Sequence, residues 1–345
     1  MAGGIGSRLW PLSRKECPKQ FVDILGVGKT FIQMTYERFA RFIPVENFLV
    51  VTGEMYKELA LEQLPMLSEK QILTEPCRRN TAPCVAYAMY KLRSMNPDAV
   101  AVITPSDQYI GNVDGFEDMM LKNLRFAAAG DALLTVGVTP SFPATGYGYI
   151  QTRENGGGGI SNVMCFREKP DLMTATRYLS QGDFYWNSGM FIWSVSAITK
   201  AFERYLPEVA DLFESISPVY GDENEQVTVN AAYEKSPNIS IDYGVMEKAE
   251  NVFVYCSSDL AWSDVGSWGA LYTLSDHDTN GNAVGEGRVF CQDSRNLLVK
   301  ELNPGKQVVI DGLEGYLIAD TKDVLLICPN RDEGYVKSLI DRFIS

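Results

Sequence analysis

Apolar residues follow two alternating spacings along the first two-thirds of the chain. Short continuous apolar runs of strand length come between stretches in which apolar residues recur every three or four positions. The runs predict strands at 48–52, 72–74, 99–103, 132–138, 149–152, 163–167 and 190–194. The helical spacing predicts helices at 54–67, 82–95, 116–129 and 171–180. This alternation is typical of an α/β fold in which a mainly parallel sheet is covered by helices on both faces.

The pattern changes after about residue 280, where turn residues separate short apolar runs. These runs predict strands at 288–290, 297–299, 308–310, 316–318 and 324–327, followed by a closing helix at 333–344. We therefore expect a larger domain at 1–280 and a small β unit at 281–345. A chain of 345 residues is long enough for about two domains. The four glycines at 156–159 are interpreted as a hairpin tip.

Residues 1–20 combine glycine with positive charge. Gly3, Gly4, Gly6 and Ser7 allow a turn whose backbone N–H groups point at an anion. The nearby cations are Arg8, Arg14, Lys15 and Lys19, against Glu16 as the single acidic residue. In a chain of net charge −13 this local reversal of sign predicts a polyphosphate site, and an ordinary solvated loop is the alternative. Two other phosphate loops are excluded, because Leu9 replaces the third glycine of G-x-G-x-x-G and no P-loop string occurs.

The amino-acid composition disfavours several classes of binding partner and of catalytic site. The acidic balance argues against nucleic acid or an anionic membrane as the main partner. The seven cysteines form no C-x-x-C pair and His277 is the single histidine, so zinc clusters and Cys–His nucleophiles are disfavoured. The odd cysteine count favours reduced thiols and a cytoplasmic protein. No stretch reads as a signal peptide or a membrane span.

Five strings carry a resemblance to a known family. Residues 3–13 read GGIGSRLWPLS, with Pro18-Lys19 after them. In the same order follow EPCRRNTAP at 75–83, TPSD at 104–107, WNSGMF at 186–191 and WSDVGSW at 262–268. Over nearly the whole chain this resembles the sugar-1-phosphate nucleotidyltransferases, and in particular the members that transfer GMP from GTP to mannose 1-phosphate. The resemblance implies a Rossmann-like (GT-A-type) sheet, a short left-handed parallel β-helix at the C-terminus, and a homodimer formed through it.

The resemblance also assigns residues to the reaction. It implies phosphate contacts from the glycine loop (Gly3, Gly4, Gly6, Ser7 and Arg8) and a further nucleotide contact from Ser106. It implies catalytic roles for Arg8, Lys19, Asp107 and Asp264, with the two aspartates holding Mg²⁺. Many relatives have histidine after the first aspartate, where this chain has Gln108. The nucleophile is already a phosphate anion, so no general base is needed and catalysis should come from positioning and positive charge.

Base and sugar contacts fall on the remaining strings. The residues matching the base site are Glu75, Arg79, Asn80 and Thr81. Guanine presents two adjacent N–H donors that a carboxylate or backbone carbonyls can accept, while Asn80-Thr81 also suits the N-cap of the helix that follows. The residues matching the hexose site are Gly146, Tyr147, Gly148, Glu168, Lys169, Asn187, Ser188 and Gly189, with Asp242 a candidate that is equally explained as a cap.

Two alternative functions remain open, and the chain differs from the family pattern at one place. The chain could transfer another nucleotide to another hexose 1-phosphate, or be a non-catalytic regulatory homologue that binds sugar nucleotides. Retention of Arg8, Lys19, Asp107 and Asp264 argues against the second. In the family a strand precedes the glycine loop, but here only Met1 and Ala2 precede Gly3. We therefore expect the natural protein to have an apolar strand of about 5–10 residues before Met1.

Overall fold

The computed structural model describes residues 1–345 apart from residues 5, 154–158, 286–287, 302–305, 332–333 and 344–345. The described chain divides into two compact units. Unit 1 comprises Met1–Gly3, Glu37–Ser106 and Ile110–Trp262, and unit 2 comprises Gly4–Tyr36, Asp107–Tyr109 and Ser263–Ser345. This grouping does not test the boundary expected near residue 280, which stays a prediction. In the described part of the chain no helix has both the length and the apolar character required to cross a membrane.

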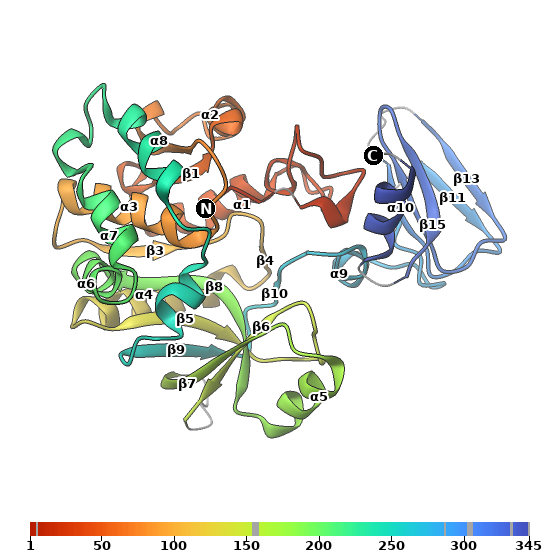
Figure 1. Cartoon of the computed structure of the whole chain (residues 1–345). Helices are drawn as coiled ribbons and strands as arrows, with labels where there is room; N and C mark the ends of the chain where they lie inside the picture. The colour runs from red at the N-terminus through yellow and green to blue at the C-terminus, as the bar shows by residue number, and fades with distance from the viewer. Residues whose placement is uncertain (5, 154–158, 286–287, 302–305, 332–333, 344–345) are drawn as a thin grey trace. The chain divides into compact units, whose positions relative to one another are not determined.

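Unit 1 is built on a six-stranded sheet in the order β3–β8–β5–β9–β7–β6 (Figure 1). Its strands are β3 (Val100–Ile103), β5 (Leu133–Val138), β6 (Gly148–Thr152), β7 (Ile160–Glu168), β8 (Phe184–Ser194) and β9 (Val252–Ser257). Neighbours β5 and β9 are parallel, whereas β8 runs antiparallel to β3, β5 and β6, and β7 to β6 and β9. The prediction of a mainly parallel sheet is therefore wrong for neighbouring pairs. The reason is that β8 is inserted between two strands of the opposite direction, and β6 and β7 form a hairpin. Most of the predicted tip at 156–159 lies outside the described residues.

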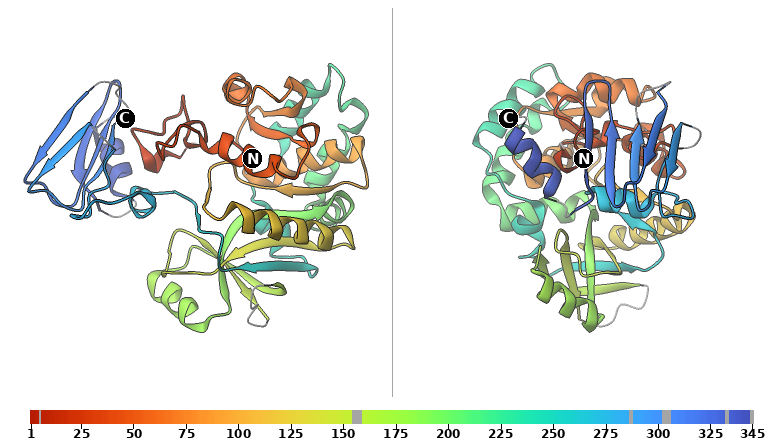
Figure 2. Two further views of the ribbon diagram at one scale, coloured as in Figure 1. Left: turned by 180° about the vertical axis from the view of Figure 1, so that it is seen from behind. Right: turned by 90° about the vertical axis from the view of Figure 1, so that its right-hand side faces the viewer.

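Helices cover both faces of this sheet. Successive residues of a strand point to opposite faces, and accordingly Leu133 and Trp193 belong to one buried cluster while Leu134 and Ile192 belong to another. The first cluster includes side chains of α3 (Thr81–Met95), α6 (Val195–Tyr205), α7 (Pro207–Glu214) and α8 (Glu225–Lys235). The second includes those of α4 (Val113–Ala128) and α5 (Leu172–Gln181). Figure 2 shows the ribbons of the helices and the sheet from two further directions. Helices α3, α4 and α5 confirm the sequence prediction, whereas α6 to α8 were not predicted.

A second, parallel pair of strands lies beside the start of the chain. It consists of β1 (Val50–Gly53) and β2 (Ile72–Glu75), connected through α2 (Lys57–Gln63). The Ala2 amide donates to the Val51 carbonyl at 2.7 Å, and the Ser106 amide donates to the Met1 carbonyl at 3.0 Å. Met1 and Ala2 therefore join β1 to the segment that follows β3, and Gly3 comes directly after them.

Unit 2 contains the strands and the closing helix predicted after residue 280. They are β11 (Val289–Gln292), β12 (Leu298–Glu301), β13 (Val308–Asp311), β14 (Tyr316–Asp320), β15 (Leu325–Pro329) and α10 (Tyr335–Phe343), preceded by α9 (Trp268–Leu274). The pairs β11–β13 and β12–β14 are parallel, and β14–β15 is antiparallel. Three elements cross between the residues of the two units, namely α1 (Phe31–Ala40), β4 (Tyr109–Ile110) and β10 (Trp262–Ser263).

The glycine-loop segment and the C-terminal strands share one hydrophobic core. From the first segment this core takes Leu9, Leu12, Ile24 and Phe31, and from the later residues it takes Val265, Leu298, Leu317, Leu326 and Val336. At the edge of this core Arg14 donates to both carboxylate oxygens of Asp323 at 2.6 and 2.7 Å, and to the Thr321 hydroxyl at 3.0 Å. The side chains of Leu9, Leu12, Ile24 and Phe31 are therefore packed with those of β12, β14 and β15 inside unit 2.

Candidate active site

The glycine loop is held tightly against the turn that contains Lys19. Gly6 has a φ of +64°, and a Cβ there would lie 2.7 Å from the Lys19 Cβ and 2.9 Å from the Ser13 hydroxyl. Only glycine combines this backbone conformation with so close an approach. The Gln20 side chain donates to the Gly4 carbonyl at 3.1 Å. The loop position is thus fixed relative to Lys19. The side chain of Ser7 lies outside the described part of the chain.

The structure brings together the four predicted catalytic residues, all of which lie in unit 2. Lys19 is almost fully buried, and its Nζ donates to Asp107 Oδ2 at 3.3 Å and to the backbone carbonyl of Asp264. The same ammonium lies 5.2 Å from the centre of the Phe31 ring. A Cβ on Gly266 would clash with the Asp264 carboxylate and would lie 2.9 Å from Arg8 Nη2, so both groups lie close to this glycine. Two cations and two carboxylates therefore gather beside the glycine loop.

Glu75 ends β2 in unit 1 and is the centre of the predicted base site. Its Oε1 accepts a hydrogen bond of 2.9 Å from the Tyr233 hydroxyl. A Cβ placed on Gly3 would lie 3.4 Å from Oε2, so the backbone of Gly3 passes close to this carboxylate. Burial raises the pKa of Glu75 to about 7, although the hydrogen bond from Tyr233 opposes that shift. The carboxylate therefore changes its charge near neutral pH.

The neighbouring residues of the base string make structural contacts. Asn80, with a φ of +63°, accepts a hydrogen bond from the Thr81 amide at the first turn of α3, as the N-cap alternative expects. The Thr81 hydroxyl accepts one from the Ile241 amide at 2.9 Å. Arg79 donates to the carbonyls of Tyr233 and Glu234, each at 3.1 Å. A guanidinium at the C-terminal carbonyls of a helix is favoured by the helix dipole, and here that helix is α8.

One predicted nucleotide-binding residue has an unused polar group. Ser106 is buried, and its amide is bonded to Met1, but its hydroxyl has no hydrogen-bond partner among the described residues. A buried hydroxyl of this kind costs about 1–3 kcal/mol unless something satisfies it. A ligand oxygen is one group that can do so.

Five residues of the predicted sugar site lie together in unit 1. A Cβ on Gly148 would lie 2.7 Å from Glu168 Oε2 and 3.4 Å from the Asn187 Cβ. The Asn187 amide donates to Asp242 Oδ1 at 2.8 Å, and its carbonyl oxygen accepts from the Gly189 amide at 3.1 Å. Burial raises the pKa of Asp242. These side chains offer donors and acceptors of the type that sugar hydroxyls require.

The remaining sugar-site predictions fall on different environments. Tyr147 packs edge-on against Trp186 and Trp262, with ring centres 5.1 and 5.5 Å apart. The Ser188 hydroxyl is buried and donates to the Val136 carbonyl at 2.6 Å. Lys169 is exposed and pairs with Glu168 at 2.9 Å. Gly146 comes directly before Tyr147 and offers only backbone groups to a ligand.

Sequence reasoning missed Tyr233, the direct partner of Glu75. It lies on α8, outside every string that carried the resemblance, and 158 positions from Glu75. The sequence over 225–235 offered no clear signal, because its apolar residues do not follow a helical spacing that would predict a buried face.

Comparisons with known proteins agree on a family. The model of the nucleotidyl transferase family matches residues 1–281. A putative mannose-1-phosphate guanylyltransferase of Vibrio cholerae is 35% identical over 99% of this chain and 73% of its own length. A mannose-1-phosphate guanylyltransferase of Escherichia coli K12 is 35% identical over 99% of this chain and 72% of its own. Among solved structures, one described as mannose-1-phosphate geranyltransferase from Thermus thermophilus is 31% identical, with a TM-score of 0.86 over 100% of this chain and 98% of that chain.

Proposed function

The chain belongs to the nucleotidyl transferase family, and we propose that it transfers GMP from GTP to mannose 1-phosphate, giving GDP-mannose and pyrophosphate. The observation that carries the proposal is the cluster in unit 2. There Lys19 is buried against Asp107 and Asp264 beside a glycine loop whose Gly6 admits no side chain. Relatives named for this activity match the chain over nearly its whole length.

The reaction forms one phosphorus–oxygen bond and breaks another. An oxygen of mannose 1-phosphate attacks the α-phosphorus of GTP, and the bond to the β-phosphate breaks so that pyrophosphate leaves in line. Both substrates are anions, so the barrier comes largely from bringing negative charge together. Lys19 stabilises charge that develops around the α-phosphorus, and Arg8 binds the pyrophosphate portion. No side chain has to remove a proton from the nucleophile.

Asp107 and Asp264 suit Mg²⁺. This ion is bound in such sites by one or two carboxylates, together with substrate phosphate oxygens and water. The described residues include no group of three or more His, Cys, Asp or Glu side chains that could hold a metal alone, so the phosphates would complete the ligand set. When bound, Mg²⁺ supplies positive charge that offsets the charge of the phosphates. The pairing of Lys19 with Asp107 orients that carboxylate before substrate arrives.

Base and sugar selection come from unit 1. Ionised Glu75 accepts the N1–H and 2-amino donors of guanine, a pair that adenine lacks. The free hydroxyl of Ser106 donates to a nucleotide oxygen. Asn187, Glu168 and Asp242 bind the hydroxyls of the hexose, with Gly148 leaving room for the ring.

Pyrophosphate release across four nucleoside triphosphates and several hexose 1-phosphates tests this function. We expect kcat/KM with mannose 1-phosphate to favour GTP over ATP by at least about tenfold, which requires ~1.4 kcal/mol of discrimination. Glu75→Gln should lose most of that preference, because an amide presents one acceptor where the carboxylate presents two. Equal use of GTP and ATP would refute the guanylyl assignment and favour a different nucleotidyltransferase.

We further propose a homodimer formed through the C-terminal strands, in a cytoplasmic enzyme. Val289 pairs with Val308, and Leu298 pairs with Leu317, so in both parallel pairs the partner lies 19 residues later in the chain. This repeat supports the short left-handed β-helix that the family resemblance implies. The paired Phe290 and Val309 are 51% and 77% exposed, which leaves an apolar patch on this sheet.

Sedimentation velocity tests this dimer. Val309→Lys should produce monomers, because it buries a charge in the proposed interface. Met173→Lys, at an equally exposed methionine of α5, is the matched control and should leave the dimer intact. A wild-type protein that sediments as a monomer would remove the proposal.

A further inference from the structure

The hydroxyl of Tyr233 contacts Glu75, the proposed acceptor of the base. Its side chain is completely buried, and its hydroxyl donates to Glu75 Oε1 at 2.9 Å. The ring packs edge-on against Phe213 and Tyr87, with ring centres 5.6 and 6.5 Å apart. The hydroxyl is therefore delivered to the carboxylate by a side chain that cannot move without disturbing the core.

The helix that carries Tyr233 is tied to the strand that carries Glu75. Thr74, the residue before Glu75, exchanges two hydrogen bonds with Gln226 of α8. Its hydroxyl donates to Gln226 Oε1 at 2.7 Å, and its carbonyl accepts from Gln226 Nε2 at 3.1 Å. Successive residues of β2 are thus bonded to α8 at two places, two turns apart along the helix.

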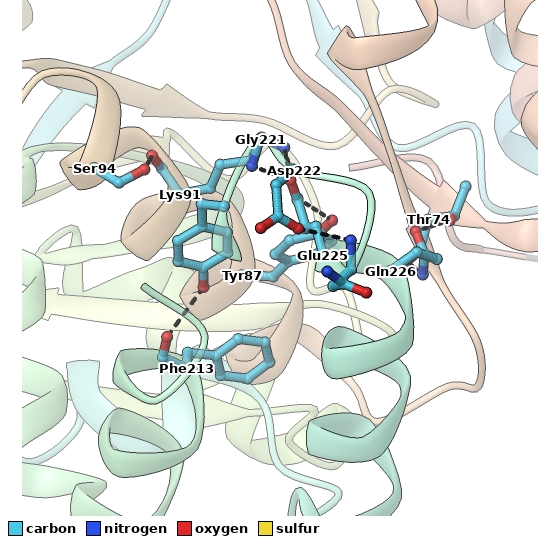
Figure 3. Close-up of polar contacts among 11 residues, drawn as sticks. Thr74, Tyr87, Lys91, Ser94, Phe213, Gly221, Asp222, Glu225 and Gln226 are labelled. Atoms are coloured by element: carbon cyan, nitrogen blue, oxygen red, sulfur yellow. Dashed lines mark hydrogen bonds and ion pairs between the residues drawn. The ribbon is translucent and has the colours of Figure 1, made fainter. Parts of the chain in front are cut away.

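The first turn of α8 is anchored by a buried ion pair (Figure 3). Both carboxylate oxygens of Glu225 accept from Lys91 of α3, at 2.5 and 2.6 Å. The same carboxylate accepts from the Tyr87 hydroxyl at 2.8 Å and from the Gly221 amide at 2.6 Å. Burial opposes the ionisation of Glu225, but these donors outweigh it and lower its pKa. Charged hydrogen bonds of this kind are strong, so they hold the start of α8 on α3.

The last turn of α8 is bonded to the loop after Glu75. Arg79 donates to the carbonyls of Tyr233 and Glu234, each at 3.1 Å. The helix is therefore held by α3 at its start, by β2 in its first turn and by the base-string loop at its end. All of these contacts lie within unit 1.

We propose that Tyr233 is a positioning residue that sets the preference for guanine by fixing the orientation and the ionised state of Glu75. The inference rests on the proposed role of Glu75 as the base acceptor. With Oε1 held by the hydroxyl, the plane of the carboxylate is fixed, and Oε2 lies beside the backbone of Gly3. A carboxylate that rotates freely, or that carries a proton, does not present two acceptors to the paired donors of guanine.

The groups around Glu75 decide its protonation together. Burial favours the neutral carboxyl, while the hydrogen bond from Tyr233 and the positive charge of Arg78 favour the ionised form and lower its pKa. Cys84 of α3 also faces this carboxylate, and its thiol remains neutral because burial raises its pKa. Loss of the Tyr233 hydroxyl should therefore raise the pKa of Glu75 further above its present value.

Tyr233→Phe removes the hydroxyl and keeps the ring. We expect the ratio of kcat/KM for GTP to that for ATP to fall by about tenfold at neutral pH, the size of one lost hydrogen bond to a charged group. The acid limb of the GTP profile should also move to higher pH. Tyr87→Phe is the matched control, because it removes a buried hydroxyl bonded to a carboxylate of the same helix but leaves Glu75 untouched. It should leave the ratio and the position of the acid limb unchanged.

The variants separate failure of this inference from failure of the proposed function. If Glu75→Gln keeps the full preference for GTP, Glu75 is not the base acceptor and the proposed base site is wrong. If Glu75→Gln loses the preference but Tyr233→Phe leaves both the ratio and the acid limb at their wild-type values, the positioning role is overturned. Equal effects of Tyr233→Phe and Tyr87→Phe would also overturn it, because a general loosening of α8 would then explain both.

Discussion

Replacing Lys19 with methionine removes one positive charge from the cluster in unit 2 while keeping most of the side chain's length. The lysine stem is buried, and its ammonium lies against Asp107, the Asp264 carbonyl and the Phe31 ring. Methionine fills similar volume with an unbranched, flexible chain, so the packing beside Gly6 should survive. The substitution therefore tests the charge more than the shape.

The expected loss of rate follows from the position of that charge. Removing one preorganised donor aimed at developing negative charge typically costs about 10²–10³ in kcat, or about 2.7–4 kcal/mol. The effect on folding should be smaller. The Asp107 side chain is 35% exposed, so water can replace its partner. We therefore expect Lys19→Met to lower kcat by at least about 10²-fold, with at most a modest change in melting temperature.

Steady-state GDP-mannose formation, with GTP and mannose 1-phosphate varied in turn, separates kcat from KM. Lys15→Met is the matched control, because it removes a lysine four residues away that is exposed rather than buried. It should retain activity near that of the wild type. A Lys19→Met enzyme with unchanged kcat and only a raised KM for GTP would show that Lys19 binds the ground state, and the assigned role would be refuted.

Two other predictions concern ions and protons. Asp107→Asn and Asp264→Asn should each lower turnover by about 10²-fold or more without loss of folding, since each removes a charged ligand of the proposed Mg²⁺ site; full activity of both variants in EDTA would contradict this. Because the pKa of Glu75 is raised to about 7 and its ionised form accepts guanine, kcat/KM for GTP should rise with pH up to about 7, level off above it, and fall about tenfold per pH unit below. The ATP profile should be flatter, and parallel profiles for the two nucleotides would argue against Glu75 as the acceptor.

The sequence was informative wherever the chemistry was local. The glycine loop, the N-cap at Asn80 and the strands after residue 280 each depend on a few adjacent residues, and each is found where the pattern placed it. The convergence of Lys19, Asp107 and Asp264 was reached through the resemblance, because nothing in the spacing of 19, 107 and 264 brings them together.

Long-range packing was less accessible to sequence reasoning. The strand β8 reads as an apolar run, but the run does not reveal that it lies antiparallel between β3 and β5. Helical spacing likewise does not reveal that Tyr233 reaches Glu75 or that Arg79 binds the end of α8. The contacts of Tyr233 and Arg79 join residues 158 and 154 positions apart, and several arrangements of the faces satisfy the same periodicity.

The core shared by Leu9, Leu12 and the C-terminal strands has a consequence for synthesis of the protein. Leu9 is translated roughly 300 residues before its packing partners Leu317, Leu326 and Val336. Contacts of such large sequence separation form late and slowly. The glycine-loop segment must therefore remain unpacked, with its leucines in water or on a chaperone, while most of unit 1 is already able to fold. The glycine-loop segment would then be translated before most of unit 1 but become competent for catalysis after it.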